Sequence, residues 1–263
     1  MQVLITGASG GIGYAVTEFL AEKGVFVYAC DLHPRNFPQK NVRFLPLDVC
    51  DSASIGQAYA QLHGEGVTLD AIVHIAGVFE IDSFIEIEES RLKRLFDVNL
   101  MGVINVNRVL YPLLGKTGRI VITTSDVAPL DPMPFNGIYN VSKTALDAYA
   151  QALRQELNLL GQRVITVRPG AFDTALSKGS LTKTQELQQK TELYRKQSAK
   201  FYRLVKGFMG KPASPTRLAH TYYRAITAKN PRLIYKKHPN LYLRLLNALP
   251  KRWQCAIIKA ILH

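Results

Sequence analysis

The stretch of sequence that decides the fold reads QVLITGASGGIG and spans residues 2–13. Its apolar first part, Gln2–Thr6, predicts a short buried strand, and the glycines that follow open a helix that we expect to end near Lys23. Glycine lets the backbone approach a pyrophosphate closely, and the first turn of a helix presents free N–H groups to it. A glycine cluster is more often a simple turn, but its position between a strand and a helix predicts a dinucleotide site.

Strands and helices alternate regularly through the rest of the chain. Apolar runs typical of strands are separated by helical patterns, and we expect further strands over 25–30, 42–47, 70–75, 118–124, 163–167 and 232–235. Such alternation predicts an α/β chain with a doubly wound Rossmann fold, in which helices cover both faces of a seven-stranded, mostly parallel sheet. We expect one domain over residues 1–263, with ligands at the carboxyl ends of the strands.

Asp31 ends the second predicted strand, about twenty residues beyond the glycines. A carboxylate there accepts hydrogen bonds from both ribose hydroxyls of NAD and repels the additional phosphate of NADP. NAD(H) is therefore the predicted cofactor, and NADP(H) is less favoured. Two alternatives remain open, because Asp31 also suits a turn before Pro34, and because His33 and Arg35 bring positive charge nearby.

The segment from Ser125 to Lys143 carries the candidate chemistry. Tyr139 and Lys143 lie four residues apart, so a helix places both on one face. An adjacent ammonium stabilises a phenolate and brings a phenol pKa of about 10 toward neutrality. Ser125, at the end of the strand over 118–124, can hydrogen-bond a substrate carbonyl at the same point. Tyr202 and Lys206 repeat the spacing in a basic, polar segment, and only the context favours Tyr139.

Two neighbouring features extend this candidate site. Asn99 lies inside a helical pattern over 88–114, where its side chain competes for backbone hydrogen bonds. It is either functional or simply exposed. The segment 127–136 is rich in proline and apolar residues, and it predicts one wall of an apolar pocket.

With these motifs in place, the chain through about residue 177 resembles the short-chain dehydrogenase/reductase family. The motif Thr6–Gly13 is similar to that family's cofactor loop, and Ser125, Tyr139, Lys143 and Asn99 are similar to its catalytic tetrad. The resemblance implies that Tyr139 is the general acid/base, that Lys143 lowers its pKa and holds the nicotinamide ribose, that Ser125 polarises the carbonyl, and that Asn99 supports a proton-relay water. Ile75 departs from the family's usual Asn, so a sheet-stabilising amide contact is in question.

The resemblance also implies where the ligands bind. Together with the residues argued from position, such as Asp31, Ala76 and Gly77, the expected cofactor residues are Gly7, Ser9, Gly10, Gly11, Ile12, Gly13, Asp31, Asp48, Val49, Ala76, Gly77, Asn99, Tyr139, Lys143, Pro169, Gly170, Phe172 and Thr174. The expected substrate residues are Ser125, Val127, Phe135, Tyr139, Phe172 and Leu176, with a substrate loop over 172–212.

The implied activity is hydride transfer between nicotinamide and a secondary alcohol or ketone. The apolar segment 127–136 and the basic C-terminal tail favour an apolar, steroid-, retinoid- or lipid-like substrate. Two other functions stay open: reduction of 3-oxoacyl groups on an acidic carrier protein, and a catalytically idle NAD-binding sensor or scaffold. Pairing through the helices near Asn99 and Tyr139 would give a homodimer or homotetramer.

Charge divides the chain unevenly. Residues 1–177 carry 14 Lys and Arg against 18 Asp and Glu, and residues 178–263 carry 19 against 2. A basic surface attracts anionic lipid, nucleic acid or an acidic carrier, or it is a solvated face that serves solubility. The basic region has no recognisable nucleic-acid reader motif, so we expect no nucleic-acid partner.

The tail over 240–263 predicts a basic amphipathic helix. Its apolar residues recur at helical spacing, with basic residues off that stripe. The stripe consists of Trp253, Ala256, Ile257, Ala260 and Ile261. The helix either packs on its own body or on a partner subunit, or it lies on an anionic membrane surface; own-body or subunit packing is slightly favoured.

Three scattered cysteines, Cys30, Cys50 and Cys255, indicate neither a disulfide framework nor a metal site. A strand that starts at Gln2 leaves no room for a signal peptide, and no apolar run is long enough to span a membrane. We therefore expect a cytoplasmic protein, with membrane association at its surface as an option.

Overall fold

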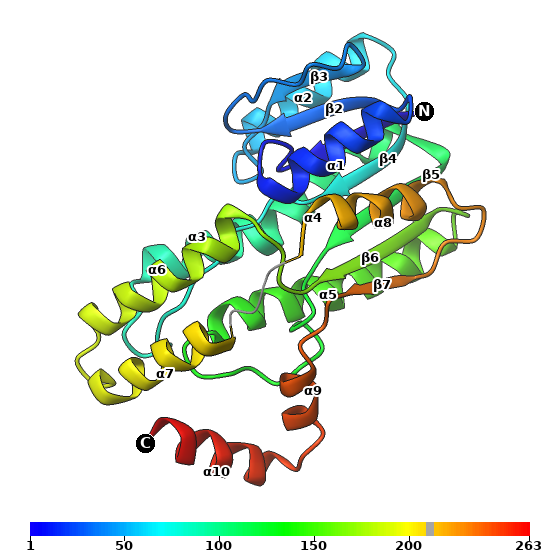
Figure 1. Cartoon of the computed structure of the whole chain (residues 1–263). Coiled ribbons are helices and arrows are strands. Elements are labelled where there is room, and N and C mark those ends of the chain that lie inside the picture. Colours follow the sequence, from blue (N-terminus) through cyan, green and yellow to red (C-terminus); the bar gives the residue numbers. More distant parts are fainter. Residues whose placement is uncertain (209–212) are drawn as a thin grey trace.

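The computed structural model describes residues 1–208 and 213–263, except for the side chains of residues 175–178 and 208. Seven strands form one sheet in the order β3-β2-β1-β4-β5-β6-β7, and each neighbouring pair is parallel (Figure 1). The strands are β1 Gln2–Thr6, β2 Phe26–Asp31, β3 Val42–Pro46, β4 Leu69–His74, β5 Leu114–Thr123, β6 Arg163–Pro169 and β7 Ile234–Lys237. The predicted doubly wound fold class is confirmed.

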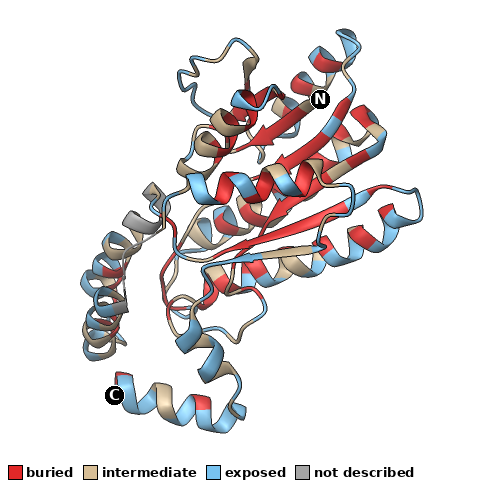
Figure 2. Cartoon of the chain, turned by 45° about the vertical axis from the view of Figure 1, so that its right-hand side comes forward, coloured by how far each residue is buried: buried red, intermediate tan, exposed pale blue. Residues whose placement is uncertain are grey.

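Alternate residues of each central strand enter two separate cores. Leu4 of β1 points into one core while Val3 and Ile5 point into the other, because successive side chains of a strand leave opposite faces. The strands are buried on both faces and therefore apolar throughout, as Figure 2 shows for the sheet centre.

Helices cover both faces. One face carries α1 Gly11–Glu22 and α8 Thr216–Thr227. The other face carries α2 Ser52–Gly64, α4 Gly102–Leu110 and α5 Gly137–Asn158. The helix expected over 88–114 is interrupted: α3 Glu89–Phe96 passes into a π-helical turn over Asp97–Met101 before α4, and a short 3₁₀ turn, Tyr111–Leu113, follows. Such π-turns are frequent at functional sites.

Four helices beyond β6 lie outside the two layers that cover the sheet. Helices α6 Ala175–Lys190 and α7 Arg195–Phe208 project away from the sheet, and α9 Leu241–Asn247 and α10 Lys251–Leu262 follow β7 (Figure 1). A third apolar cluster joins α6, α7 and α10 to the loops beside the sheet through Leu187, Phe201, Leu262, Ile81 and Phe135. In residues 1–208 and 213–263, no helix has the length and apolar character that a bilayer crossing needs.

The C-terminal helix packs on the body of the protein, which is one form of the protein packing that the sequence slightly favoured. The residues of the predicted apolar stripe, however, do not make this contact. Leu262 and Ile258 join the third cluster, and Gln254 is buried beside them. Trp253 and Ile261 of the predicted stripe are instead 62% and 48% exposed. Polar partners explain the difference, because the Gln254 amide donates to Asp131 at 3.0 Å and to the Leu249 carbonyl at 2.8 Å.

Candidate active site

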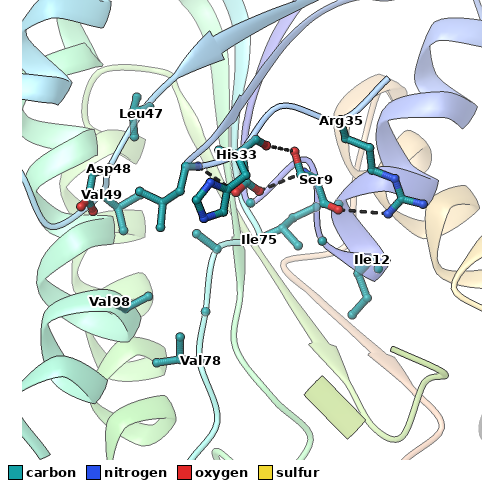
Figure 3. Close-up of a pocket in the computed structure, with 18 of the residues that line it drawn as sticks. Ser9, Ile12, His33, Arg35, Leu47, Asp48, Val49, Ile75, Val78 and Val98 are labelled. Carbon is teal, nitrogen blue, oxygen red and sulfur yellow. Dashed lines mark hydrogen bonds between the residues drawn. The ribbon is translucent and has the colours of Figure 1, made fainter. Parts of the chain in front are cut away.

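A cavity of about 600 Å³ lies at the carboxyl ends of β1, β2, β3 and β4. The glycine loop and Ile12 form one side, Asp48 and Val49 the opposite side, and Ile75 and Val78 lie between them (Figure 3). The structure places twelve of the expected cofactor residues here, namely Gly7, Ser9, Gly10, Gly11, Ile12, Gly13, Asp31, Asp48, Val49, Ala76, Gly77 and Thr174.

The glycine loop folds tightly against itself and against the end of β4. Gly7 has a φ of 73°, which other residues rarely adopt. A Cβ atom on Gly13 would lie 1.9 Å from the Gly7 carbonyl oxygen, and one on Gly7 would lie 2.5 Å from the Ala76 nitrogen. The packed glycines leave the N-terminus of α1 facing the cavity, and this cradle fits a pyrophosphate.

The Asp31 carboxylate lies at the mouth of the glycine loop. One oxygen accepts from the Ser9 N–H at 2.9 Å and the other from the Leu32 N–H at 2.8 Å. Arg35 donates to the Ser9 carbonyl at 3.1 Å (Figure 3) and stacks 3.5 Å from the Tyr14 ring centroid. Carboxylate and guanidinium therefore share this end of the cavity.

Sequence reasoning missed several lining residues, among them Leu32 and Val78, and also two from a single helical segment, Arg94 and Val98. They lie four apart, on α3 and the π-helical turn, so one helix face points both toward Asp48 and Val49. The spacing from Asn99 could have drawn attention to them, because Val98 is its neighbour in the chain.

A second cavity of about 110 Å³ holds the candidate chemistry. Ser125, Tyr139 and Lys143 line it, together with Pro169, Gly170, Phe172 and Thr174. It shares Ile12, Ile75, Gly77, Val78 and Thr174 with the larger cavity. The two cavities thus form one cleft that runs from Asp31 to Tyr139.

Helix α5 places the proton-transfer groups. The Ser125 hydroxyl hydrogen-bonds the Tyr139 phenol, and the Phe79 ring packs edge-on against Tyr139 with centroids 4.8 Å apart. The Lys143 ammonium lies 5.9 Å from the Tyr139 ring centroid and donates to the Thr123 carbonyl at 3.4 Å. Phenol, hydroxyl and ammonium therefore meet at one end of the cleft.

Burial is the largest cause of the pKa shifts of both Tyr139 and Lys143. It raises the pKa of Tyr139 to about 12, although the Ser125 hydrogen bond lowers it. Burial also lowers the pKa of Lys143 to about 8. The Asp126 charge also raises the Tyr139 pKa, and Lys143, whose ammonium donates to Thr123, is not among the groups that shift it.

The face of α5 that carries Tyr139 and Lys143 continues one turn further to Asp147. Its carboxylate accepts from Thr124 at 3.1 Å and from two nitrogens of Arg168, at 2.9 and 2.5 Å. Thr124 follows β5 and Arg168 belongs to β6. This contact fixes α5 relative to the strand ends that carry Ser125.

Asn99 lies in the π-helical turn, is fully buried and lines neither cavity. Its side chain accepts from the Val78 N–H at 2.8 Å and donates to the Val78 carbonyl at 3.0 Å and to the Ser142 hydroxyl at 3.1 Å. It therefore holds the segment after β4 against α5. Ile75, which replaces the family's usual Asn, packs against the second core and lines the cleft instead.

The expected substrate residues separate. Ser125, Tyr139 and Phe172 line the smaller cavity. Phe135 packs instead against Tyr194 and Phe201 in the third cluster, and Val127 lies in the loop that α5 holds, its carbonyl accepting from Asn140 at 3.1 Å. The side chain of Leu176 lies outside the described residues, as does 209–212 of the predicted substrate loop.

One tyrosine of the predicted pairs lies away from the site, and one carboxylate beside the site was not predicted. Tyr202 lies on α7, where the Gln185 amide donates to it at 3.3 Å, and it lines neither cavity. Asp126, which sequence reasoning missed, follows Ser125, and burial raises the pKa of its carboxyl. Its place directly after Ser125 is the signal that could have found it.

Comparison with known proteins gives consistent relatives. The profile of the short chain dehydrogenase family matches residues 1–185. A 3-ketodihydrosphingosine reductase from Bacteroides thetaiotaomicron is 28% identical over 253 residues, covering 95% of this chain and 92% of that protein. An NADPH-dependent 1-acyldihydroxyacetone phosphate reductase from Saccharomyces cerevisiae is 31% identical over 183 residues, 66% of this chain and 62% of that protein.

A solved structure is also similar. A short chain dehydrogenase/reductase from Burkholderia phymatum, in complex with NAD, has a TM-score of 0.72 and 25% sequence identity, covering 90% of this chain and 89% of that one.

Proposed function

The chain belongs to the short chain dehydrogenase family and is an oxidoreductase, and from this premise we propose that it interconverts a secondary alcohol and a ketone on an apolar, lipid-like substrate with NAD(H). The observation that carries the proposal is the single cleft that joins the glycine cradle to Ser125, Tyr139 and Lys143. The glycine cradle would hold the dinucleotide, and the cleft leads from this cradle to the Tyr139 phenol.

In this proposal each residue of the smaller cavity has one task. When bound, nicotinamide dinucleotide supplies or accepts the hydride. Ser125 donates a hydrogen bond to the substrate oxygen, and Tyr139 gives that oxygen a proton during reduction or removes one during oxidation. Lys143 stabilises the phenolate when its ammonium turns from Thr123 toward the phenol. Asn99 acts through Val78 and Ser142, as a positioning residue.

Support for NAD(H) comes from Asp31. Its carboxylate faces the cleft beside Ser9, where ribose hydroxyls can donate to it and a phosphate would be repelled. Arg35 is the opposing consideration, because a guanidinium binds phosphate well. It is held by Ser9 and Tyr14, so we propose that Asp31 decides and that NADP(H) binds more weakly.

Support for a lipid-like substrate comes from the walls of the cleft and from the relatives. Phe172, Val78 and Ile75 line the smaller cavity, with Phe79 against Tyr139. The matched proteins include reductases named for a ketodihydrosphingosine and an acyldihydroxyacetone phosphate. A hydrocarbon chain attached to a carbonyl has the chemistry that such walls bind.

Two other parts of the proposal concern the surroundings of the enzyme. Met101 and Val141, on the helices near Asn99 and Tyr139, are 43% and 37% exposed, and we propose that a homodimer or homotetramer forms over them. We place the enzyme in the cytoplasm, with a membrane contact argued in the next section.

The test is an absorbance assay of NADH and NADPH consumption with a panel of long-chain, steroidal and small ketones. We expect NADH oxidation that rises with the hydrocarbon length of the ketone. Turnover only with a 3-oxoacyl carrier protein would favour the carrier alternative. Tight NADH binding with no turnover on any ketone would favour the idle sensor or scaffold.

A further inference from the structure

Helices α9 and α10 carry apolar side chains that face away from the protein. This pair of helices, residues 240–262, is mostly exposed in Figure 2. The large apolar groups on it and their exposed fractions are Leu241 63%, Tyr242 69%, Leu245 60%, Trp253 62% and Ile261 48%. Five such groups within one short segment form the kind of surface that marks an interaction site.

The pair is held to the body by other residues. The Asp131 carboxylate accepts from Asn247 at 2.5 Å and from Gln254 at 3.0 Å, and it also pairs with Lys251. Leu262 anchors the end of α10 in the third apolar cluster. The attachment thus uses polar contacts and one face, so burial against the body does not explain the exposed apolar groups.

Charge indicates the partner. No Asp or Glu follows Glu192 in the sequence, whereas 16 Lys and Arg do. Arg244, Arg252 and Lys259 on the pair are exposed, as are Lys236 and Lys237 on the adjoining β7. Cations beside exposed apolar groups, with Trp and Tyr among them, match the headgroup boundary of an anionic bilayer.

We propose that the α9–α10 pair is the attachment surface for a membrane leaflet rich in anionic lipid, with Leu245, Trp253 and Ile261 entering the headgroup boundary. A second copy of the chain is disfavoured on this surface, because a two-fold interface would set like charges against each other. An acidic carrier protein would neutralise the cations but gives no reason for the exposed Trp and Leu groups.

The same surface adjoins the catalytic cavity. The Asn240 N–H, at the start of α9, donates to Asp126 at 3.0 Å, next to Ser125 in the chain. His238 packs edge-on against Phe172 with centroids 5.3 Å apart, and a Cβ atom on Gly170 would lie 1.9 Å from the His238 carbonyl oxygen. If the proposed lipid-like substrate is right, it approaches the cavity from the side that rests on the membrane.

The direct test uses the full-length protein and vesicles of phosphatidylcholine, with and without phosphatidylserine. Trp253 is the single tryptophan of the chain, so its emission reports on this surface alone. We expect flotation with phosphatidylserine vesicles, a blue shift of the emission, and loss of binding at high salt. Absence of flotation, or flotation with an unchanged emission, would overturn the proposal.

Matched variants locate the surface. The double variant Arg252→Glu and Lys259→Glu should bind phosphatidylserine vesicles at least about tenfold more weakly. Each basic side chain near an anionic leaflet adds to the binding free energy, and this variant replaces two of them with acidic groups. Lys116→Glu with Lys229→Glu makes the same charge change on two exposed lysines elsewhere and should lose much less binding. Equal losses in the two double variants would contradict the assignment.

A second pair of variants tests the apolar groups and keeps Trp253 as reporter. Leu245→Ser with Ile261→Ser should weaken binding about tenfold, whereas Leu159→Ser with Leu160→Ser, on side chains 84% and 62% exposed, should leave it unchanged. If the first pair instead halves the particle mass in light scattering and leaves vesicle binding intact, a second copy covers this surface and the proposal is wrong.

These readouts need no catalysis, so they separate this inference from the proposed function. Arg252→Glu with Lys259→Glu should oxidise NADH with a water-soluble ketone at the wild-type rate. Vesicle binding without any turnover would support the membrane surface and refute the proposed activity. Turnover without vesicle binding would support the activity and refute the membrane surface.

Discussion

Residues 1–177 carry a small excess of acidic side chains and supply six of the seven strands, whereas residues 178–263 are strongly basic and add α8 and β7 to the sheet body and α6, α7, α9 and α10 outside it. In the first region most of the predicted site residues lie at strand ends or on α5, and Asn99 lies in the π-helical turn. In the second, several large apolar groups face solvent. Among the described residues, the first region supplies every side chain that lines the two cavities, whereas the second supplies the exposed apolar groups of α9 and α10.

The two Tyr–Lys pairs, one in each region, give the largest expected difference in activity. Tyr139→Phe should reduce kcat by about 10²–10⁴-fold, because the proton donor is lost, while NADH binding persists. Tyr202→Phe removes the same hydroxyl from the same spacing in the basic region and should change kcat little. Steady-state kinetics with NADH titration by fluorescence measures both. Full activity in Tyr139→Phe would remove the chemical assignment.

Glycine-to-alanine substitutions should change the free energy of unfolding in opposite directions in the two regions. Gly13→Ala drives a methyl group into the Gly7 carbonyl and should lower the free energy of unfolding by about 3 kcal/mol and abolish NADH binding. Gly179→Ala in α6 meets no atom within 4 Å and should raise stability by about 0.5–1 kcal/mol. Urea denaturation measures both free energies of unfolding. Destabilisation by Gly179→Ala would show that other atoms pack against this position of α6.

His74 makes the core of the first region sensitive to acid. Burial lowers its pKa to about 4, while a hydrogen bond with Asn107 opposes this. The unfolded chain binds a proton near pH 6.5 and the folded chain does not, so stability is full above pH 6.5 and falls as pH drops toward 4, by up to about 3 kcal/mol. This loss should vanish in His74→Gln and persist in His263→Gln. Urea midpoints between pH 7 and 4 test it.

Substitution of Asp31 should have the smallest effect of the four, a change in the KM values for NADH and NADPH, and it tests cofactor choice directly. Asp31→Asn should raise the KM for NADH by about tenfold and lower that for NADPH, because a charge-assisted acceptor and a repulsive charge are both removed. Arg35→Gln is the matched control, and it should weaken NADPH more than NADH. If Arg35→Gln alone reversed the preference, the guanidinium would be the deciding residue.

The regular part of the fold could be predicted closely because its signals are local. The strand Gln2–Thr6 is predicted and observed over the same residues. The relation of Ser125, Tyr139 and Lys143 follows from helix spacing and from the common edge at which parallel strands end.

The residue positions that could not be predicted from the sequence depend on contacts between distant segments. The position of Asn99 follows from Val78 and Ser142, 21 and 43 residues away. Phe135, which has a φ of 64°, joins the third cluster through Tyr194 and Phe201. In α10, periodicity cannot distinguish two apolar faces, and Asp131 decides the outcome by binding Gln254.

The two edges of the sheet differ from its interior in a way that bears on assembly. At one edge β3 ends in the exposed Pro46, which has no N–H to offer, and at the other β7 ends in the exposed pair Lys236 and Lys237. Such edges discourage the addition of a further strand from another molecule. The sheet is therefore guarded against end-to-end growth into fibrils at high concentration, and copies of the chain should associate through their helices.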